Sequence, residues 1–462
     1  MDYSGDESKM SITEEIAAFI VETDYCQMSG EVVRVGRQAI ADGLAVALAG
    51  CREPASMIIR EYVREQGGRP ESIVIGDGTR TSASLAALAN GIAVHVLAFD
   101  DVSHSWLGHP AAVLVPAVLA LGEKCRISGK AVLEAYILGC EVGAKIGRVV
   151  AAKQFERGWH VTSSLGSLAS AVAAAKILRL DLNETRMAIG IAASEASGLR
   201  ANFGSMTKAL HPGLAARNGV VASILAKKGF SANENIVEND LGFIDTFAGG
   251  EEHNLVELSA SLGAPFDIVS LGLTIKPYPC CRMTHSCIDA VLHLNKEYHF
   301  SVEDIARVEC ITSGLAQQIA TFRYPRTVTE AKLSMQYGIA MALLDGEVVL
   351  SQFTDTRIQD PKVQALMRKI EHVSGRDMVE ENGEVIIKLQ DGRECSHIVC
   401  RPKGDPMNPM SEKELLSKWQ DCASLVLSPE NVEKFLTLVL SFESLEDIME
   451  LAEVLRQARA DA

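Results

Sequence analysis

Apolar residues in the N-terminal part of the chain recur with the period of an α-helix. Ile12, Ile16, Phe19 and Ile20 stand at positions i, i+4, i+7 and i+8, which puts all four on one face of a helix. The same period is found in the ranges 113–121, 130–149, 165–178 and 214–228, the last of which precedes Gly229, a residue type that favours helix ends. The pattern predicts a mostly helical segment from residue 12 to about residue 271.

The pattern changes after residue 272. Residues 306–312 alternate like a strand, and the ranges 385–389 and 395–400 flank an Asp-Gly pair suited to a tight hairpin turn. Helical patches at 284–294 and 330–344 lie between these strands, and the helical period returns from Ser411 to the end. We therefore expect a mostly α fold in three segments: 1–271 and 404–462 form one helical domain, and 272–403 forms a smaller α+β lid. A cleft between domain and lid is the default place for a ligand.

Composition narrows the class of protein. The chain has 462 residues, of which 47% are hydrophobic and 5% aromatic, and its net charge is −16. Such an acidic chain is repelled by phosphate backbones and anionic lipid, so we expect neither a nucleic-acid nor a membrane partner. The N-terminus lacks the features of a signal peptide, and the 11 cysteines have no disulfide-framework spacing. We expect a cytoplasmic protein.

Packing does not explain five polar stretches, which are residues 100–110, 158–164, 203–213, 276–285 and 325–332. Asp100, Asp101 and His104 suggest either a metal site or a solvated loop with helix-capping carboxylates, and the residues alone leave both open. Lys208 and His211, three positions apart among small residues, could hold a carboxylate and exchange a proton. The adjacent Cys280 and Cys281 lack a second pair at zinc-finger spacing, so we do not expect zinc there. We expect a buried structural role for both cysteines rather than nucleophilic catalysis. The sequence has no Walker loop, Gly-x-Ser-x-Gly elbow or His-Glu-x-x-His motif.

Taken in order, these stretches resemble the MmgE/PrpD family, which includes 2-methylcitrate dehydratases, cis-aconitate decarboxylases and an iminodisuccinate epimerase. The resemblance runs over residues 12–455 and depends on six motifs in register. They are Asp100-Asp101 with His109-Pro110, Gly158-Trp159-His160, the run from Phe203 to Lys208 with 215–219, Lys276-Pro277-Tyr278-Pro279-Cys280-Cys281, Pro325-Arg326-Thr327, and the run from Glu330 to Tyr337.

The resemblance implies a helical domain built from both chain ends, an α+β lid and a homodimer. It also implies catalysis on small di- or tricarboxylates without a metal or an organic cofactor. It implies four catalytic residues: His109, His160, Lys208 and Lys276. Further residues expected to bind the substrate are Asp101, Ser205, His211, Arg282 and Tyr324. In this interpretation the lysines hold a carboxylate and the histidines move a proton, although His160 beside Trp159 could also be a core imidazole.

The chain departs from the family pattern at three positions. Many members have an Asp and a Thr where this chain has Ala98 and Val102, and some have a Tyr where it has Phe322, with Tyr324 nearby as a substitute. Four functions stay open: dehydration of a citrate-like acid, decarboxylation of a cis-aconitate-like acid, epimerisation of an amino-dicarboxylate, and non-catalytic carboxylate binding. Retention of both histidines and both lysines favours an enzyme, with dehydration as the first hypothesis.

Overall fold

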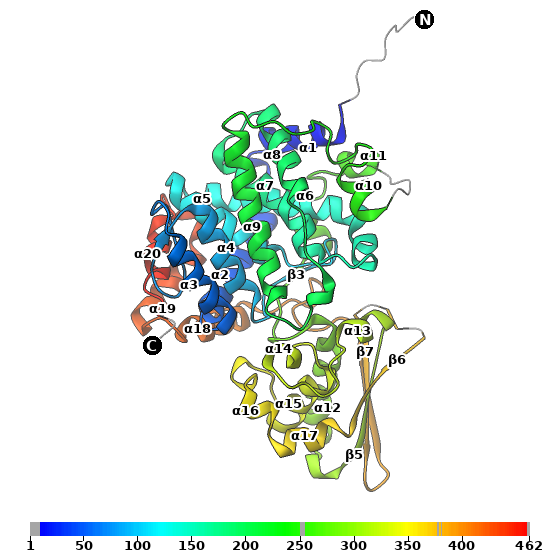
Figure 1. Cartoon of the computed structure of the whole chain (residues 1–462). Helices are drawn as coiled ribbons and strands as arrows, with labels where there is room; N and C mark the ends of the chain where they lie inside the picture. Colours follow the sequence, from blue (N-terminus) through cyan, green and yellow to red (C-terminus); the bar gives the residue numbers. More distant parts are fainter. Residues whose placement is uncertain (1–9, 250–254, 377, 380, 460–462) are drawn as a thin grey trace, which may run out of the picture.

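The computed structural model describes residues 10–249, 255–376, 378–379 and 381–459. Figure 1 shows two parts, a large body of helices and a smaller part with a sheet on one side. Each part has its own hydrophobic core. The expectation of a mostly α fold is confirmed, whereas the domain boundaries at 271/272 and 403/404 stay a prediction.

The large body combines helices from both ends of the chain. Phe435 and Leu451 near the C-terminus share one core with Ile16 and Leu44 near the N-terminus. The helices of its first segment are α1 (Ile12–Glu22), α2 (Gly30–Gly50), α3 (Pro54–Gln66), α4 (Ala83–His95), α5 (Pro110–Cys125), α6 (Gly129–Glu156), α7 (Val161–Leu178), α8 (Leu182–Ser194), α9 (Thr207–Ala226), α10 (Phe243–Ala248) and α11 (Leu255–Ala260). The C-terminal helices are α18 (Glu412–Ser424), α19 (Pro429–Leu440) and α20 (Met449–Leu455). Two small antiparallel pairs join β1 (Ser72–Ile73) to β2 (Arg80–Thr81) and β3 (Val102–Ser103) to β4 (Leu273–Thr274).

Small residues let the central helices approach closely. Gly213 of α9 lies against the backbone of Leu88 in α4, and Gly219 of α9 lies against Ser170 of α7, so a Cβ at either glycine would clash. Helix α7 has the length and composition of a membrane span, but 94% of it is buried inside the body. It is therefore the central helix of the bundle, because an apolar helix covered on all sides is a core helix.

The smaller part is a four-stranded sheet with helices on one face (Figure 1). The strand order is β6-β5-β7-β8, with β5 parallel to β6 and antiparallel to β7. Alternate residues of β7, such as Val385 and Ile387, are buried, as one-sided packing requires. The strands are β5 (Ile305–Thr312), β6 (Ile370–Ser374), β7 (Gly383–Leu389) and β8 (Glu394–Val399), and the helices are α12 (His285–Tyr298), α13 (Gly314–Ile319), α14 (Val328–Ala331), α15 (Met335–Asp345), α16 (Asp355–Ile358) and α17 (Pro361–Met367).

Two local sequence predictions have clear outcomes. The hairpin around Asp391 and Gly392 is present as β7 and β8. The helical patch at 330–344 is interrupted, because Ser334 accepts a hydrogen bond from the Tyr337 N–H and begins a new helix. The break lets Lys332 turn towards the large body, where its Nζ donates to the carbonyl of Val96.

Candidate active site

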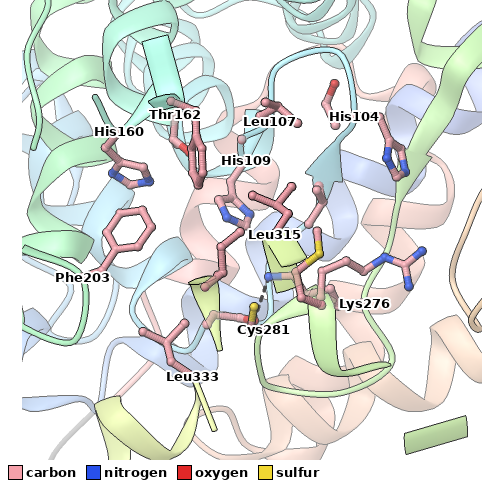
Figure 2. A pocket seen from close by; sticks show the side chains of 18 of the residues that line it. His104, Leu107, His109, His160, Thr162, Phe203, Lys276, Cys281, Leu315 and Leu333 are labelled. Atoms are coloured by element: carbon pink, nitrogen blue, oxygen red, sulfur yellow. Dashed lines mark hydrogen bonds between the residues drawn. The ribbon is translucent and has the colours of Figure 1, made fainter. Parts of the chain in front are cut away.

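A cavity of about 110 Å³ lies between the helical body and the smaller part. The structure brings all four predicted catalytic side chains, His109, His160, Lys208 and Lys276, to its wall. Figure 2 shows His109, His160 and Lys276 around this space together with Phe203 and Leu315. Residues up to 167 positions apart in the chain therefore share one site (276 minus 109).

Three of these side chains stand at the beginnings of helices. His109 directly precedes α5, whose first residue is Pro110, and His160 directly precedes α7. Lys208 lies in the first turn of α9. Helix N-termini have unpaired N–H groups and a positive potential, so three of them at one cavity favour an anionic ligand. The Oγ1 of Thr162 also lines the cavity and has no hydrogen-bond partner among the described residues.

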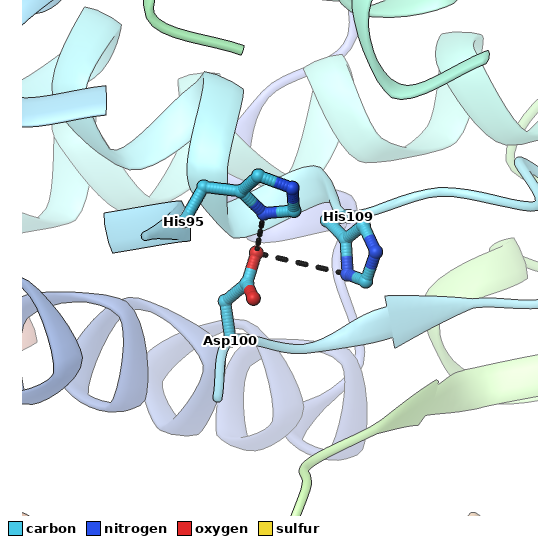
Figure 3. A group of neighbouring side chains, drawn as sticks. All are labelled: His95, Asp100 and His109. Atoms are coloured by element: carbon cyan, nitrogen blue, oxygen red, sulfur yellow. Dashed lines mark hydrogen bonds and ion pairs between the residues drawn. The ribbon is translucent and has the colours of Figure 1, made fainter. Parts of the chain in front are cut away.

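A buried chain of hydrogen bonds holds Lys208 from behind. Its Nζ donates to Nε2 of His95 at 2.7 Å, and Nδ1 of His95 lies 2.7 Å from Oδ2 of Asp100 (Figure 3). An ammonium only donates hydrogen bonds, so Nε2 of His95 accepts and its Nδ1–H donates to Asp100. Asp100 therefore orients His95, and His95 orients Lys208.

Four imidazoles at or directly behind the cavity, those of His95, His109, His160 and His211, are neutral near pH 7. Burial lowers the pKa of His95, His109 and His160 well below 6.5, and burial with the charge of Lys208 lowers the pKa of His211 to about 4. Nδ1 of His109 lies 2.6 Å from the carbonyl oxygen of Asp101, to which it donates, so its Nε2 has a free lone pair. His109 is therefore equipped to accept a proton.

The two lysines supply the positive charge. Burial and the nearby ammonium of Lys276 lower the pKa of Lys208 to about 8, against the opposing attraction of Asp100. Nζ of Lys276 donates to the carbonyl of Ala98 at 2.9 Å and lies 3.8 Å from Oδ1 of Asp100. Lys208 thus remains charged at neutral pH and can release its proton at modest cost, which suits a general acid.

Two clusters among the described residues have the geometry of metal ligands. In the first, ligand atoms of His95, Asp100 and His109 lie within 4.8 Å of one another. The ammonium groups of Lys208 and Lys276 contact this same cluster, at His95 and at Asp100. A divalent cation would be repelled by both, so the donor set does not fit a metal.

The second cluster joins His104, Glu381 and Asp405. Nη2 of Arg282 lies 3.0 Å from Glu381 and 3.2 Å from Asp405, so a guanidinium already occupies the place of a cation. Burial and the neighbouring Asp405 raise the pKa of Glu381 to about 7, although Arg282 opposes this. Arg282 and Glu381 both line the cavity, and the carboxylate of Glu381 lies 3.5 Å from Nδ1 of His104 in the helical body.

The expected substrate-binding residues are distributed unevenly. Arg282 lines the cavity, whereas His211 stands behind it, with its Nδ1 3.0 Å from Nδ1 of His160. Ser205 lines a second cavity of about 410 Å³, which shares Ala98, Lys208 and Leu333 with the first.

Asp101 and Tyr324 do not have the expected positions. Asp101 is fully buried and lines neither cavity, and its carboxylate accepts from the N–H of Ala111 near the beginning of α5. Tyr324 is 47% exposed and also lines neither cavity. In this structure Asp101 caps a helix, and Tyr324 faces solvent.

Sequence reasoning missed His95 and the role of Asp100. His95 is the last residue of α4, whose other buried residues are mostly apolar, so its pattern resembles a core position. The only signal was its position as the sole ionisable residue of this helix.

Burial raises the pKa of Cys280 to about 12 and also raises that of Cys281. Both thiols are therefore protonated, as their expected structural role requires.

Known proteins match the chain along almost its full length. The MmgE/PrpD N-terminal domain matches residues 14–256, and the MmgE/PrpD C-terminal domain matches residues 278–444. The cis-aconitate decarboxylase-like protein oryM of Aspergillus oryzae is 27% identical, over 96% of this chain and 96% of that protein. The cis-aconitate decarboxylase of Mus musculus is 29% identical, over 96% of this chain and 93% of its own. The mitochondrial 2-methylcitrate dehydratase of Yarrowia lipolytica is 23% identical, over 80% of this chain and 73% of its own.

Proposed function

This chain belongs to the MmgE/PrpD family, and we propose that it is a cofactor-independent lyase that acts on a small di- or tricarboxylate. One observation carries the proposal: a neutral imidazole with a free Nε2, His109, stands at the same cavity as the ammonium groups of Lys208 and Lys276. Cations that hold a carboxylate stabilise the negative charge that develops on the carbon next to it. A neutral imidazole can accept the proton from that carbon.

Decarboxylation needs a carboxylate holder and a proton donor. The bond between the carboxylate carbon and the chain breaks, CO2 leaves, and the electron pair stays on the chain carbon. Lys208 then gives its proton to that carbon and regains one from solvent. Relatives named cis-aconitate decarboxylase match 96% of this chain, so we place this reaction first.

Dehydration is the second candidate, supported by the name of the Yarrowia lipolytica relative. In this reaction Nε2 of His109 takes a proton from the carbon beside a carboxylate, and the electron pair forms the double bond. The hydroxyl on the next carbon leaves as water with the proton of Lys208. His160, whose Nδ1 pairs with His211, is the second group for proton transfer in either reaction.

We also propose a cytoplasmic homodimer that needs neither metal nor organic cofactor. The reaction is tested by incubating purified protein with cis-aconitate, citrate and 2-methylcitrate and following the products by proton NMR. Loss of CO2 supports the first reaction, and loss of water supports the second. Inversion at one carbon of an amino-dicarboxylate would indicate an epimerase instead. Binding of these acids without any conversion would indicate a carboxylate-binding protein.

A further inference from the structure

We propose that the substrate carries an apolar substituent in place of a third carboxylate; this inference rests on the proposed function and narrows its substrate class. The cavity is chemically divided. The lysines and histidines form one side, and the remaining wall is largely apolar. Figure 2 shows Leu107, Leu315 and Leu333 pointing into the space that also contains His109 and Lys276.

The apolar wall comes from both parts of the protein. The helical body contributes Ala98, Val102, Leu107 and Phe203, and the smaller part contributes Leu315 and Ile319 of α13. Ala98 and Val102 are the positions where many family members have polar residues. A carboxylate against this wall would lose its water without gaining a hydrogen bond, which costs several kcal/mol.

The charges at the cavity do not suffice for three carboxylates. Lys208 and Lys276 are the cations on the catalytic side, and Asp100 balances one of them. Nε and Nη1 of Arg282 have no partner among the described residues, but its Nη2 already pairs with Glu381 and Asp405. A further carboxylate at Arg282 would compete with Glu381 and with the buried carboxylate of Asp405 for one guanidinium, so Arg282 is a poor third site.

A matched pair of ligands distinguishes a substrate with an apolar substituent from one with a third carboxylate. cis-Aconitate is maleate with a carboxymethyl group, and isobutylmaleate has a similar size with the charged carboxylate replaced by an isopropyl group. None of the alkylmaleates needs to react, because the readout is the dissociation constant measured by calorimetry. We expect isobutylmaleate to bind at least tenfold more tightly than cis-aconitate. From methyl- to propylmaleate, each added methylene should tighten binding about fourfold, the equivalent of about 0.8 kcal/mol.

A variant locates the apolar site. Leu315→Arg puts a cation on the wall and should reverse the order, so that cis-aconitate binds more tightly than isobutylmaleate. The control is Ile398→Arg on β8, because Ile398 is 51% exposed and lies outside the cavity; it should leave both constants unchanged. The chain-length series needs only the wild-type protein, so it tests the inference even where Leu315→Arg fails to fold.

The outcomes distinguish this inference from the proposed function. If cis-aconitate is converted by the wild type and binds as tightly as isobutylmaleate, only the apolar-substituent inference is wrong. The apolar-substituent inference is also wrong if the affinity of the alkylmaleates does not rise with the length of the alkyl group. If the protein binds no maleate of the series and converts no carboxylic acid, both proposals are contradicted.

Discussion

Replacement of Lys208 by methionine should stabilise the protein and inactivate it at the same time. The pKa of Lys208 falls from 10.5 to about 8, mainly because burial removes water from the ammonium. At about 1.36 kcal/mol per pH unit, that fall represents roughly 3 kcal/mol of stability lost at neutral pH. Because Lys208 keeps partial contact with solvent, we expect a gain of about 1 to 3 kcal/mol from Lys208→Met, which preserves the length of the side chain.

The pH dependence of the free energy of unfolding identifies the cause of the stability gained by Lys208→Met. Below pH 8 the ammonium of Lys208 is charged in both the folded and the unfolded protein. The full free-energy cost of burying this charge therefore lowers the stability of the folded state. Between pH 8 and 10.5 the folded protein releases the proton and the unfolded chain keeps it, so the cost disappears as the pH rises. The advantage of Lys208→Met should therefore be largest at pH 7 and vanish near pH 10.5. A change in packing alone would give a difference independent of pH.

The assay is urea unfolding of the wild type and Lys208→Met at several pH values from about 7 to 10, followed by circular dichroism. Lys434→Met, at an exposed position, controls for the loss of a lysine. Turnover of Lys208→Met should fall by a factor on the order of 10² to 10³, as for other lost electrostatic donors. A Lys208→Met variant that is less stable than the wild type at neutral pH, or a difference in stability that stays constant across the alkaline range, would show that charge burial is not the cause.

Three further predictions follow from the site and from the family. His160→Gln keeps a polar side chain but cannot relay a proton, so kcat should fall at least tenfold while the dissociation constant of the carboxylic acid stays within about twofold; unchanged kcat would contradict its role. Exhaustive chelation should leave turnover unchanged, because two ammonium groups contact the His95–Asp100–His109 cluster; recovery of lost activity by a divalent ion would contradict this. Light scattering should give the mass of a dimer at micromolar concentration, and a monomer would contradict the expected assembly.

The sequence predicted the fold well where apolar spacing determines the element. The helical period of 165–178 and the Asp-Gly turn at 391–392 each correspond to an observed element. The break before Ser334 was missed, because Ser334 begins a new helix inside an otherwise continuous apolar pattern.

The candidate site could be predicted from the sequence less completely than the fold. Motif order identified four side chains at one cavity, but it could not tell which of Asp100 and Asp101 contacts the residues that hold the lysines. The two aspartates are adjacent in the sequence, and only the packed structure shows that Asp100 contacts His95 while Asp101 caps α5. His95 was missed for a related reason: its importance comes from contact with Lys208, 113 positions away.

The central claim is that this cavity transfers a proton at a carbon next to a carboxylate. The direct test is to incubate the wild type and Lys208→Met with the panel of carboxylic acids in deuterated water and to follow the carbon-bound hydrogens by NMR. We expect the wild type to introduce deuterium at the carbon beside a carboxylate, in product or in recovered substrate, and Lys208→Met to do so at least ~10²-fold more slowly. Acids that bind to the wild type without any conversion or deuterium incorporation would contradict it.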